Sequence, residues 1–135
     1  MPMGAPVGAP MNDGMSSSTA KRSRLPPRRA SETFRFELGG LHYHATISRF
    51  HYHATISRFT EGGRVAEIFL SNHRSGSQAD ANARDAAVAA SLAFQYGCPL
   101  EVLRGALLRD MQGSPATPLG MALDIVAQHE TGSAR

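Results

Sequence analysis

The sequence predicts an α+β fold: a three-stranded antiparallel meander with two to three helices packed on one face, and a fourth strand if a duplicated segment joins the sheet. Three observations predict this fold. Apolar residues alternate over 33–38 and again over 41–48, which is typical of half-buried strands. Paired glycines stand where such strands would turn. An alanine-rich run over 79–96 then adopts helical spacing.

The first predicted strand, 33–38, places its large apolar residues on one face and its charged residues on the other. Gly39-Gly40 follows and predicts a two-residue hairpin turn, because both glycines accept positive φ without penalty. The second strand then begins at Leu41. The Thr60–Gly63 segment predicts another hairpin turn, so we expect Val65–Ser71 to pair antiparallel with the strand before it.

A nine-residue segment occurs twice without a change, first as 42–50 and directly afterwards as 51–59. Because nine is odd, one straight strand through both copies would place Tyr43 and Tyr52 on opposite faces of the sheet. We therefore expect one copy to occupy the second strand and the other to form an extra hairpin arm, a bulge or a loop. The sequence leaves open which copy takes which place.

The alanine-rich helix has clear signals at both ends. Ser77 and Asp80 have the spacing of a capping box, which makes Ser77 the predicted N-cap and Asp80 the reciprocal acid. The helix is predicted to run to about Tyr96, where Gly97 ends it in a left-handed conformation. Its small side chains predict close approach to the sheet or to another helix.

Two further helices are predicted after Gly97. Proline is favoured at the first helical position, so Pro99 predicts the start of a helix that has Cys98 as its N-cap and ends at Arg109. After a loop over 111–115, a last helix is expected from about Pro118 to Glu130.

The charge of the chain is concentrated at its N-terminal end. Residues 1–30 hold five of the 14 basic residues and one of the 11 acidic ones, so residues 31–135 hold nine basic and ten acidic residues. We predict a disordered, basic, Pro/Gly/Ser-rich tail over 1–30 and a folded domain over 31–130. The basic segment Lys21–Arg29 suits either a phosphate-contacting arm or a solvated linker. We favour the linker, because aromatic residues that could stack on bases do not interrupt it.

The composition also bears on location. No stretch approaches 18 consecutive apolar residues, so we expect no membrane-spanning helix. The N-terminus lacks the apolar core of a secretory signal. A single cysteine, Cys98, leaves no internal disulfide and is compatible with a reducing compartment. We expect a cytoplasmic protein.

The strand-to-helix turn is the best candidate for a ligand contact. Its backbone amides and the positive end of the helix dipole could hold a phosphate of a nucleotide, with Arg74 adding charge. The candidate residues are His73, Arg74, Ser75, Gly76 and Ser77. The pattern lacks a complete phosphate loop, so we favour a turn that only caps the helix.

Two other features invite chemical hypotheses. Cys98 at a helix N-terminus could have a lowered pKa and react, although a lone cysteine beside a helix end is more often a packing residue.

The duplicated segment contains two His-x-His pairs, whose imidazoles would share a strand face and could hold zinc or copper. We favour surface histidines and predict no metal site. The residues alone therefore predict a binding or interaction module that is not a self-sufficient enzyme.

A series of segments in fixed order carries a resemblance to a known domain. These segments are Gly39-Gly40, Arg58–Leu70, Ser75–Ser77, Asp80–Gln95, Gly97–Glu101 and Pro118–Gly120. Their order resembles the TSCPD domain over residues 31–128, and we assign a TSCPD-like domain to 31–130. The sequence departs from the family in two ways: the Thr-Ser-Cys-Pro-Asp string that names it does not occur, and the duplicated nine residues interrupt the strand region.

The TSCPD domain is found mainly at the C-terminal end of adenosylcobalamin-dependent (class II) ribonucleotide reductases, and also as short stand-alone proteins. The resemblance implies a link to ribonucleoside-diphosphate reductase and deoxyribonucleotide synthesis, in an accessory role that binds a nucleotide or a reductase catalytic subunit. In that family the reaction needs a radical-bearing cysteine and a reducing cysteine pair within a large barrel. With one cysteine, this chain is expected to be non-catalytic alone and to bind no cofactor alone. Adenosylcobalamin is implied only for a partner reductase.

Overall fold

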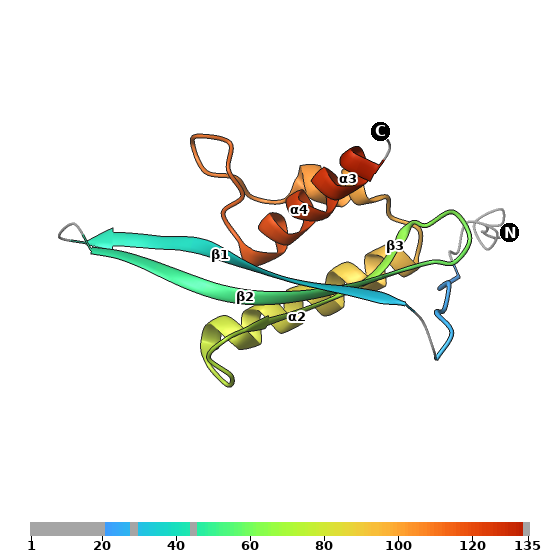
Figure 1. Ribbon diagram of the computed structural model, residues 1–135, viewed down its shortest axis with the longest axis horizontal. Coiled ribbons are helices and arrows are strands. Elements are labelled where there is room, and N and C mark those ends of the chain that lie inside the picture. The colour runs from blue at the N-terminus through green and yellow to red at the C-terminus, as the bar shows by residue number, and fades with distance from the viewer. Residues whose placement is uncertain (1–20, 28–29, 44–45, 134–135) are drawn as a thin grey trace, which may run out of the picture.

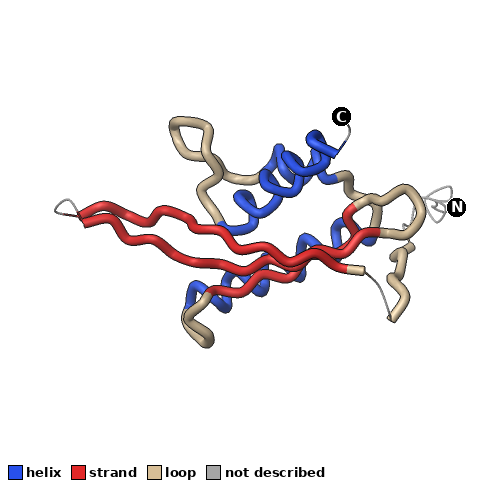
Figure 2. Tube along the Cα trace, in the orientation of Figure 1, coloured by secondary structure: helices blue, strands red, loops and turns tan. Residues whose placement is uncertain are grey.

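The computed structural model describes residues 21–27, 30–43 and 46–133 of the chain. Its elements, in chain order, are β1 (Ser31–Tyr43), β2 (Thr46–Arg58), β3 (Val65–Asn72), α2 (Gln78–Gln95), α3 (Leu100–Ala106) and α4 (Pro118–Ser133). The strands form one antiparallel sheet with the order β1-β2-β3, and the helices follow in sequence (Figures 1 and 2). The predicted α+β class is confirmed. Within the described part of the chain the sheet has three strands.

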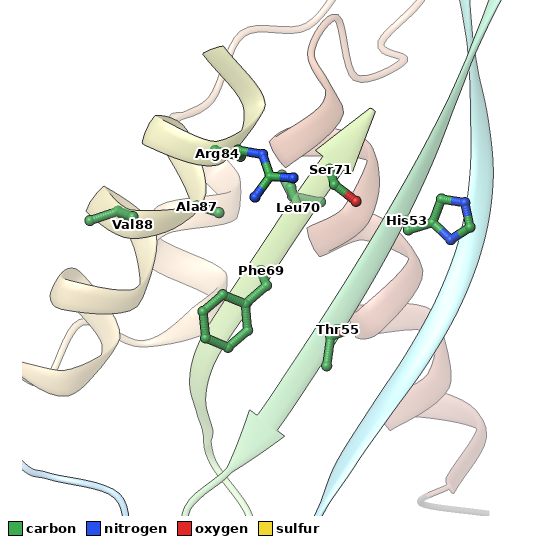
Figure 3. A pocket seen from close by; sticks show the side chains of 8 residues that line it. All are labelled: His53, Thr55, Phe69, Leu70, Ser71, Arg84, Ala87 and Val88. Atoms are coloured by element: carbon green, nitrogen blue, oxygen red, sulfur yellow. The ribbon is translucent and has the colours of Figure 1, made fainter. Parts of the chain in front are cut away.

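One hydrophobic core joins the sheet to the helices. Figure 3 shows that α2 lies beside the edge strand β3 and that α4 lies behind the sheet. The predicted alternation of the strands accounts for this core, because every second side chain of a strand faces the helices. The buried cluster contains Phe36 from β1, Tyr52, Ala54 and Ile56 from β2, Ile68 and Leu70 from β3, Ala83, Ala87, Ala90 and Phe94 from α2, and Leu119, Ala122, Leu123 and Val126 from α4.

The second copy of the duplicated segment forms the centre of the sheet. From Tyr52 to Ser57 it pairs with β1 on one side and with β3 on the other. The first copy extends the β1–β2 hairpin into an arm that projects beyond α2 and α4 (Figure 1, left), where Tyr43 pairs with Thr46. The expectation of one copy in the sheet and one in an extra hairpin arm is therefore confirmed.

The predicted turn at Gly39-Gly40 is wrong. Both glycines lie inside β1, where Gly39 pairs with Arg49. The turn was predicted from local conformational freedom alone. The nine extra residues supply partners for the chain beyond the glycines, so the two strands continue to pair instead of reversing.

A β-bulge in the arm compensates for the odd number of residues that the repeated segment adds to the hairpin. The pairing shifts between Gly39 and His42, which pairs with Ile47, so the two residues at 40 and 41 stand opposite the single residue at 48. Two residues opposite one is the definition of a β-bulge. Because of this bulge, the hairpin accommodates nine added residues while the side chains of the core strands keep pointing to the same sides of the sheet.

The ends of α2 follow the sequence signals closely. The Ser77 hydroxyl accepts a hydrogen bond from the Asp80 backbone N–H, as predicted for the N-cap. Asp80 does not return a bond to Ser77, because its carboxylate instead accepts from the backbone amides of Asn72 at 2.9 Å and Gly76 at 3.2 Å. At the other end Gly97 has φ of 102°, and the Cys98 N–H donates to the Ala93 carbonyl, which closes a Schellman motif.

Polar side chains of α2 cover the free edge of β3. The Ser91 hydroxyl accepts from the Ile68 N–H and donates to the Ile68 carbonyl, each at 2.9 Å. The Gln95 side-chain amide donates to the Ala66 carbonyl at 3.1 Å, and the Asp80 carboxylate accepts from the Asn72 backbone N–H. An exposed strand edge is a template for pairing with other chains, and here the helix occupies it.

The segment after α2 differs in detail from the prediction. The N-cap of α3 is Pro99 and not Cys98, so the helix begins at Leu100. Proline fixes φ near −68° there, but the ψ of 150° is extended, which delays the helix by one residue. The helix also ends at Ala106 rather than at Arg109.

Beyond α3, Asp124 ties three segments together. It accepts hydrogen bonds from Arg104 of α3 at 2.8 Å and from Arg109 of the following loop at 2.7 and 3.0 Å. The two guanidinium groups hold the pKa of this carboxyl below its usual range, with the Arg109 bonds contributing most. This cluster fixes α3 and the loop against α4.

Candidate functional site

The predicted ligand turn after β3 is occupied by the chain's own hydrogen bonds. The amide of Gly76 donates to the Asp80 carboxylate, and the amides of His73, Arg74 and Ser77 donate to the His51 carbonyl, the Asn72 side chain and the Arg74 carbonyl. The Asp80 carboxylate lies under the turn, and a hydrogen bond from Arg84 is the main cause that holds the pKa of this carboxyl below its usual range. An anion bound here would compete with these acceptors. The contacts assigned to His73, Arg74, Ser75, Gly76 and Ser77 stay a prediction.

Several histidines share the sheet face that points away from the helices. The rings of His51 and His73 meet edge to face with centroids 5.7 Å apart, and His51 Nδ1 lies 3.5 Å from a Glu37 oxygen. A shallow polar pocket lies over these residues and His53. In the part of the chain that the structure describes, no three His, Cys, Asp or Glu side chains are arranged to hold a metal ion. The side chains of the first His-x-His pair, at 42 and 44, lie outside the described residues.

Cys98 lies between α2 and α3, where it is half-buried. Its thiol is 3.6 Å from the Pro99 carbonyl oxygen, a long contact to a neutral acceptor. Because Pro99 takes the N-cap position, the helix start that was expected to activate this thiol begins one residue later. A reactive role for Cys98 stays a prediction.

The basic segment near the N-terminus contacts the end of α2. The Arg22 Nε donates to the Gln95 side-chain oxygen at 2.5 Å, and the Ser23 N–H donates to the Gln95 carbonyl at 2.7 Å. Positive charge at a helix C-terminus is stabilising, and α2 has no basic residue of its own in its last turn. The predicted tail over 1–30, with Lys21–Arg29 as a solvated linker rather than a phosphate-contacting arm, stays a prediction, because residues 1–20 and 28–29 lie outside the described part.

A large apolar cleft, which sequence reasoning missed, lies between the base of the arm, α2 and the segment before α4. It has a volume of about 890 Å³ and draws its walls from elements far apart in sequence. The Tyr52 side chain borders it, and burial raises the pKa of the Tyr52 hydroxyl while the Asn72 side chain partly offsets this. The other lining residues are Leu38, Gly39, Phe50, Ala79, Asn82, Ala83, Ala86, Leu107, Asp110, Pro115, Ala116, Thr117, Pro118 and Leu119.

A second apolar feature is exposed on α2 and the neighbouring strand. Val88 and Leu92 of α2 and Tyr96, the C-cap of this helix, recur every four residues, and Phe69 of β3 lines the same pocket as Val88 (Figure 3). These four large side chains, here called the α2 outer surface, are 39–57% exposed. The guanidinium of Arg84 reaches over the strand at one end (Figure 3), where Asp80 pairs with it. Nothing in the sequence pattern indicated that Phe69 of β3 would extend the exposed apolar side chains of α2.

The fold and these surfaces define a small α+β domain with an apolar cleft and an exposed apolar helix face. No family model matches the sequence, and no solved structure matches it. A vitamin B12-dependent ribonucleotide reductase of Agrobacterium fabrum (strain C58 / ATCC 33970) is 33% identical over 81 residues. That match covers 60% of this chain and 6% of the reductase, so this chain corresponds to a small part of that protein. The similarity is consistent with the TSCPD-like region and links the chain distantly to a ribonucleotide reductase.

None of the helices that the structure describes is long and apolar enough to span a lipid bilayer.

Proposed function

We propose that the chain is a stand-alone TSCPD-like accessory module, which associates with a separate B12-dependent ribonucleotide reductase catalytic chain and so serves deoxyribonucleotide synthesis in the cytoplasm. The observation that carries the proposal is the 81-residue similarity to 6% of such a reductase. In that relative the similar segment belongs to a far longer polypeptide. A detached module would therefore have to reach a reductase chain through its surface.

The α2 outer surface is the part of the module that we propose docks on the reductase. Contiguous exposed apolar side chains on a soluble domain mark contact sites, because water-exposed apolar area is unfavourable. Val88 and Leu92 lie one turn apart on α2 and Tyr96 caps its C-terminal end, so these three side chains are held in a row by one helix. Aromatic residues such as Phe69 and Tyr96 at the two ends are typical anchors of protein interfaces.

The chemistry of the chain supports an accessory role. Its single thiol is half-buried and cannot form an internal cysteine pair, so the reducing equivalents for ribonucleotide reduction would come from the partner. We expect no turnover by the chain alone. We expect adenosylcobalamin and the radical chemistry to belong to the partner reductase.

The test mixes the purified chain with a purified B12-dependent reductase loaded with adenosylcobalamin and measures association by biolayer interferometry. Val88→Asp and Leu92→Asp should each weaken binding at least about tenfold, since a buried carboxylate at an interface costs well over 1 kcal/mol. Val102→Asp is the matched control, because Val102 is equally exposed at 61% but lies on α3. Absence of binding, or equal losses in the two valine variants, would reject this docking surface.

The cleft favours a second candidate function, which is nucleotide binding. It is large enough for a small organic ligand and combines apolar walls with the polar groups of Tyr52, Asn82 and Asp110. Calorimetric titration with nucleoside diphosphates and triphosphates tests it. Ala86→Leu narrows the cleft and should lower affinity, whereas Ala89→Leu on the exposed side of α2 should not. A chain that binds none of these nucleotides excludes this role.

A further inference from the structure

The duplicated segment has a consequence for the stability of the sheet register. In the structure, copy 51–59 supplies the central strand, with Tyr52 stacked on Phe36 and with Ile56 buried at 2% exposure. Copy 42–50 has the same residue at each corresponding position. Every side chain that the central strand contributes to the core therefore exists a second time, nine residues earlier.

An alternative pairing, here called the slipped register, places each residue of the first copy where the residue nine positions later now lies in β2. Phe36 then faces Tyr43 instead of Tyr52, Thr33 faces Thr46 instead of Thr55, and Asn72 faces Tyr43 as it now faces Tyr52. Nine residues would shift a strand by an odd number and invert its faces if the sequence were not duplicated. Because the chain slips by one whole copy, each face keeps its residue types.

The ends of the hairpin also fit the slipped pairing. The present inner register pairs Leu38 with Phe50, and lowering the second number by nine pairs Leu38 with Leu41. Only Gly39 and Gly40 then remain between the strands, as a two-residue turn with the residues best suited to it. The turn that the sequence predicted is therefore the turn of the alternative register.

We infer that the domain has two interchangeable registers, in which either copy of the nine-residue segment serves as the central strand. In the observed register the spare copy forms the arm beyond Gly39. In the slipped register the spare copy, 51–59, lies at the opposite end of the sheet, between the central strand and the Thr60–Gly63 turn. The two states share the same core residues, so only the spare copy and its connections distinguish their free energies.

The two registers build the cleft differently. In the observed register Phe50 lines the cleft wall, and in the slipped register Leu41 takes its position. A molecule that fills the cleft against Phe50 binds the observed register better, and it shifts the population toward that register by the difference in affinity. Through the repeat, a molecule bound in the cleft would thus determine at which end of the sheet the spare copy lies.

Disulfide trapping in the full chain reads out the register. The hydroxyls of Thr33 and Thr55 meet across the strands at 2.9 Å on an exposed face, so cysteines at these positions can be bridged. The variant carries Thr33→Cys, Thr46→Cys, Thr55→Cys and Cys98→Ser, and it is oxidised in a glutathione buffer. Trypsin cuts after Arg49 and Arg58, which places positions 46 and 55 on different peptides. We expect mostly the 33–55 bridge, with the 33–46 bridge in roughly 0.1–10% of the chains, the range of a minor state.

Substitutions in one copy should then move the balance. Ile56→Asn puts an amide in the core of the observed register only, and we expect the 33–46 bridge to become the major product while the chain stays folded by circular dichroism and gel filtration. Ile47→Asn should eliminate the 33–46 bridge and leave the fold unchanged. The double variant, which has no intact copy, should be unfolded.

Two results would overturn the inference. One is an Ile56→Asn chain that is as unfolded as the double variant, since a spare copy able to replace the central strand would have rescued it. The other is an Ile56→Asn chain that stays folded but still forms the 33–55 bridge, since that register would then tolerate the change without slipping.

Discussion

The Ser91 hydroxyl binds both backbone groups of Ile68, because it accepts from the N–H and donates to the carbonyl at 2.9 Å each. One side chain thus satisfies the two polar groups that an adjacent strand would otherwise have paired. With Gln95 and Asp80 on the same helix, it allows an alanine-rich helix to take the place of a fourth strand along β3.

Ser91→Ala should lower the free energy of unfolding by about 1–3 kcal/mol, the cost of leaving buried backbone groups without partners. Chemical denaturation measures this loss, and hydrogen exchange at the Ile68 amide should accelerate. Ser75→Ala, in the exposed turn before α2, is the control and should stay within about 0.5 kcal/mol. Equal stability of the Ser91 variant and the wild type would mean that water replaces the hydroxyl without cost.

Phe94→Ala should destabilise the domain by about 3–5 kcal/mol, because Phe94 is fully buried between the sheet and the helices and its loss leaves a cavity. Val88→Ala on the exposed side of the same helix should change stability by less than about 0.5 kcal/mol. Thermal unfolding of the two variants measures the contrast. Similar melting temperatures of the two variants would show that burial of Phe94 contributes little to the stability of the domain.

Acid should weaken the domain through Asp80 and Asp124. The pKa of each carboxyl is lower in the folded chain than its ordinary value near 3.8, chiefly through hydrogen bonds from Arg84 and Arg109 respectively. At low pH the unfolded chain therefore binds more protons, so this stabilisation is complete above the ordinary value and is lost as the pH falls through the folded value.

Replacing Asp124 by Asn tests this sign. The variant should lose stability at pH 7 and show a flatter fall in stability between about pH 5 and pH 2. Asp85→Asn, at an exposed position of α2, controls for the removal of one carboxyl from the chain. Denaturation midpoints over this pH range give the comparison, and a slope that Asp124→Asn leaves intact would contradict the assignment.

Removing one copy of the repeat should leave the core intact. Deletion of 42–50 and deletion of 51–59 yield the same polypeptide, in which Gly39-Gly40 is the hairpin turn and Leu38 faces Leu41. We expect its stability to lie within about 1 kcal/mol of the full chain, because the deletion removes the arm and not the buried pairs. Cross-strand contacts between Phe36 and the remaining repeat tyrosine, measured by NMR, check the register. Loss of a cooperative unfolding transition would show that the arm is needed for folding.

Much of the fold follows from local patterns in the sequence. Alternation identified the apolar faces of the strands, and Ser77 and Gly97 marked both ends of α2, because capping depends on residues that are adjacent in sequence. The position of the first turn did not follow from such patterns. Two identical copies give identical local signals, and only the total pairing of the strands decides between them.

The candidate surfaces were less accessible to sequence reasoning. The cleft joins Phe50 of the arm to Leu119 of α4, and no local pattern relates such distant residues. The edge contacts of α2 were missed for another reason. Ser91 and Gln95 are ordinary polar residues on an alanine-rich helix, and their roles depend on the free backbone groups of a strand.

Gln95 binds two different segments of the chain, the sheet and the basic segment, and it uses a different atom for each hydrogen bond. Its Nε2 donates to Ala66 in the sheet, whereas its oxygens receive Arg22 and Ser23. The contacts of Arg22 and Ser23 therefore use different atoms of Gln95 from the contact that Gln95 makes with the start of β3. If Arg22 and Ser23 moved away from α2, the hydrogen bond that Gln95 donates to Ala66 would still have both of its partners.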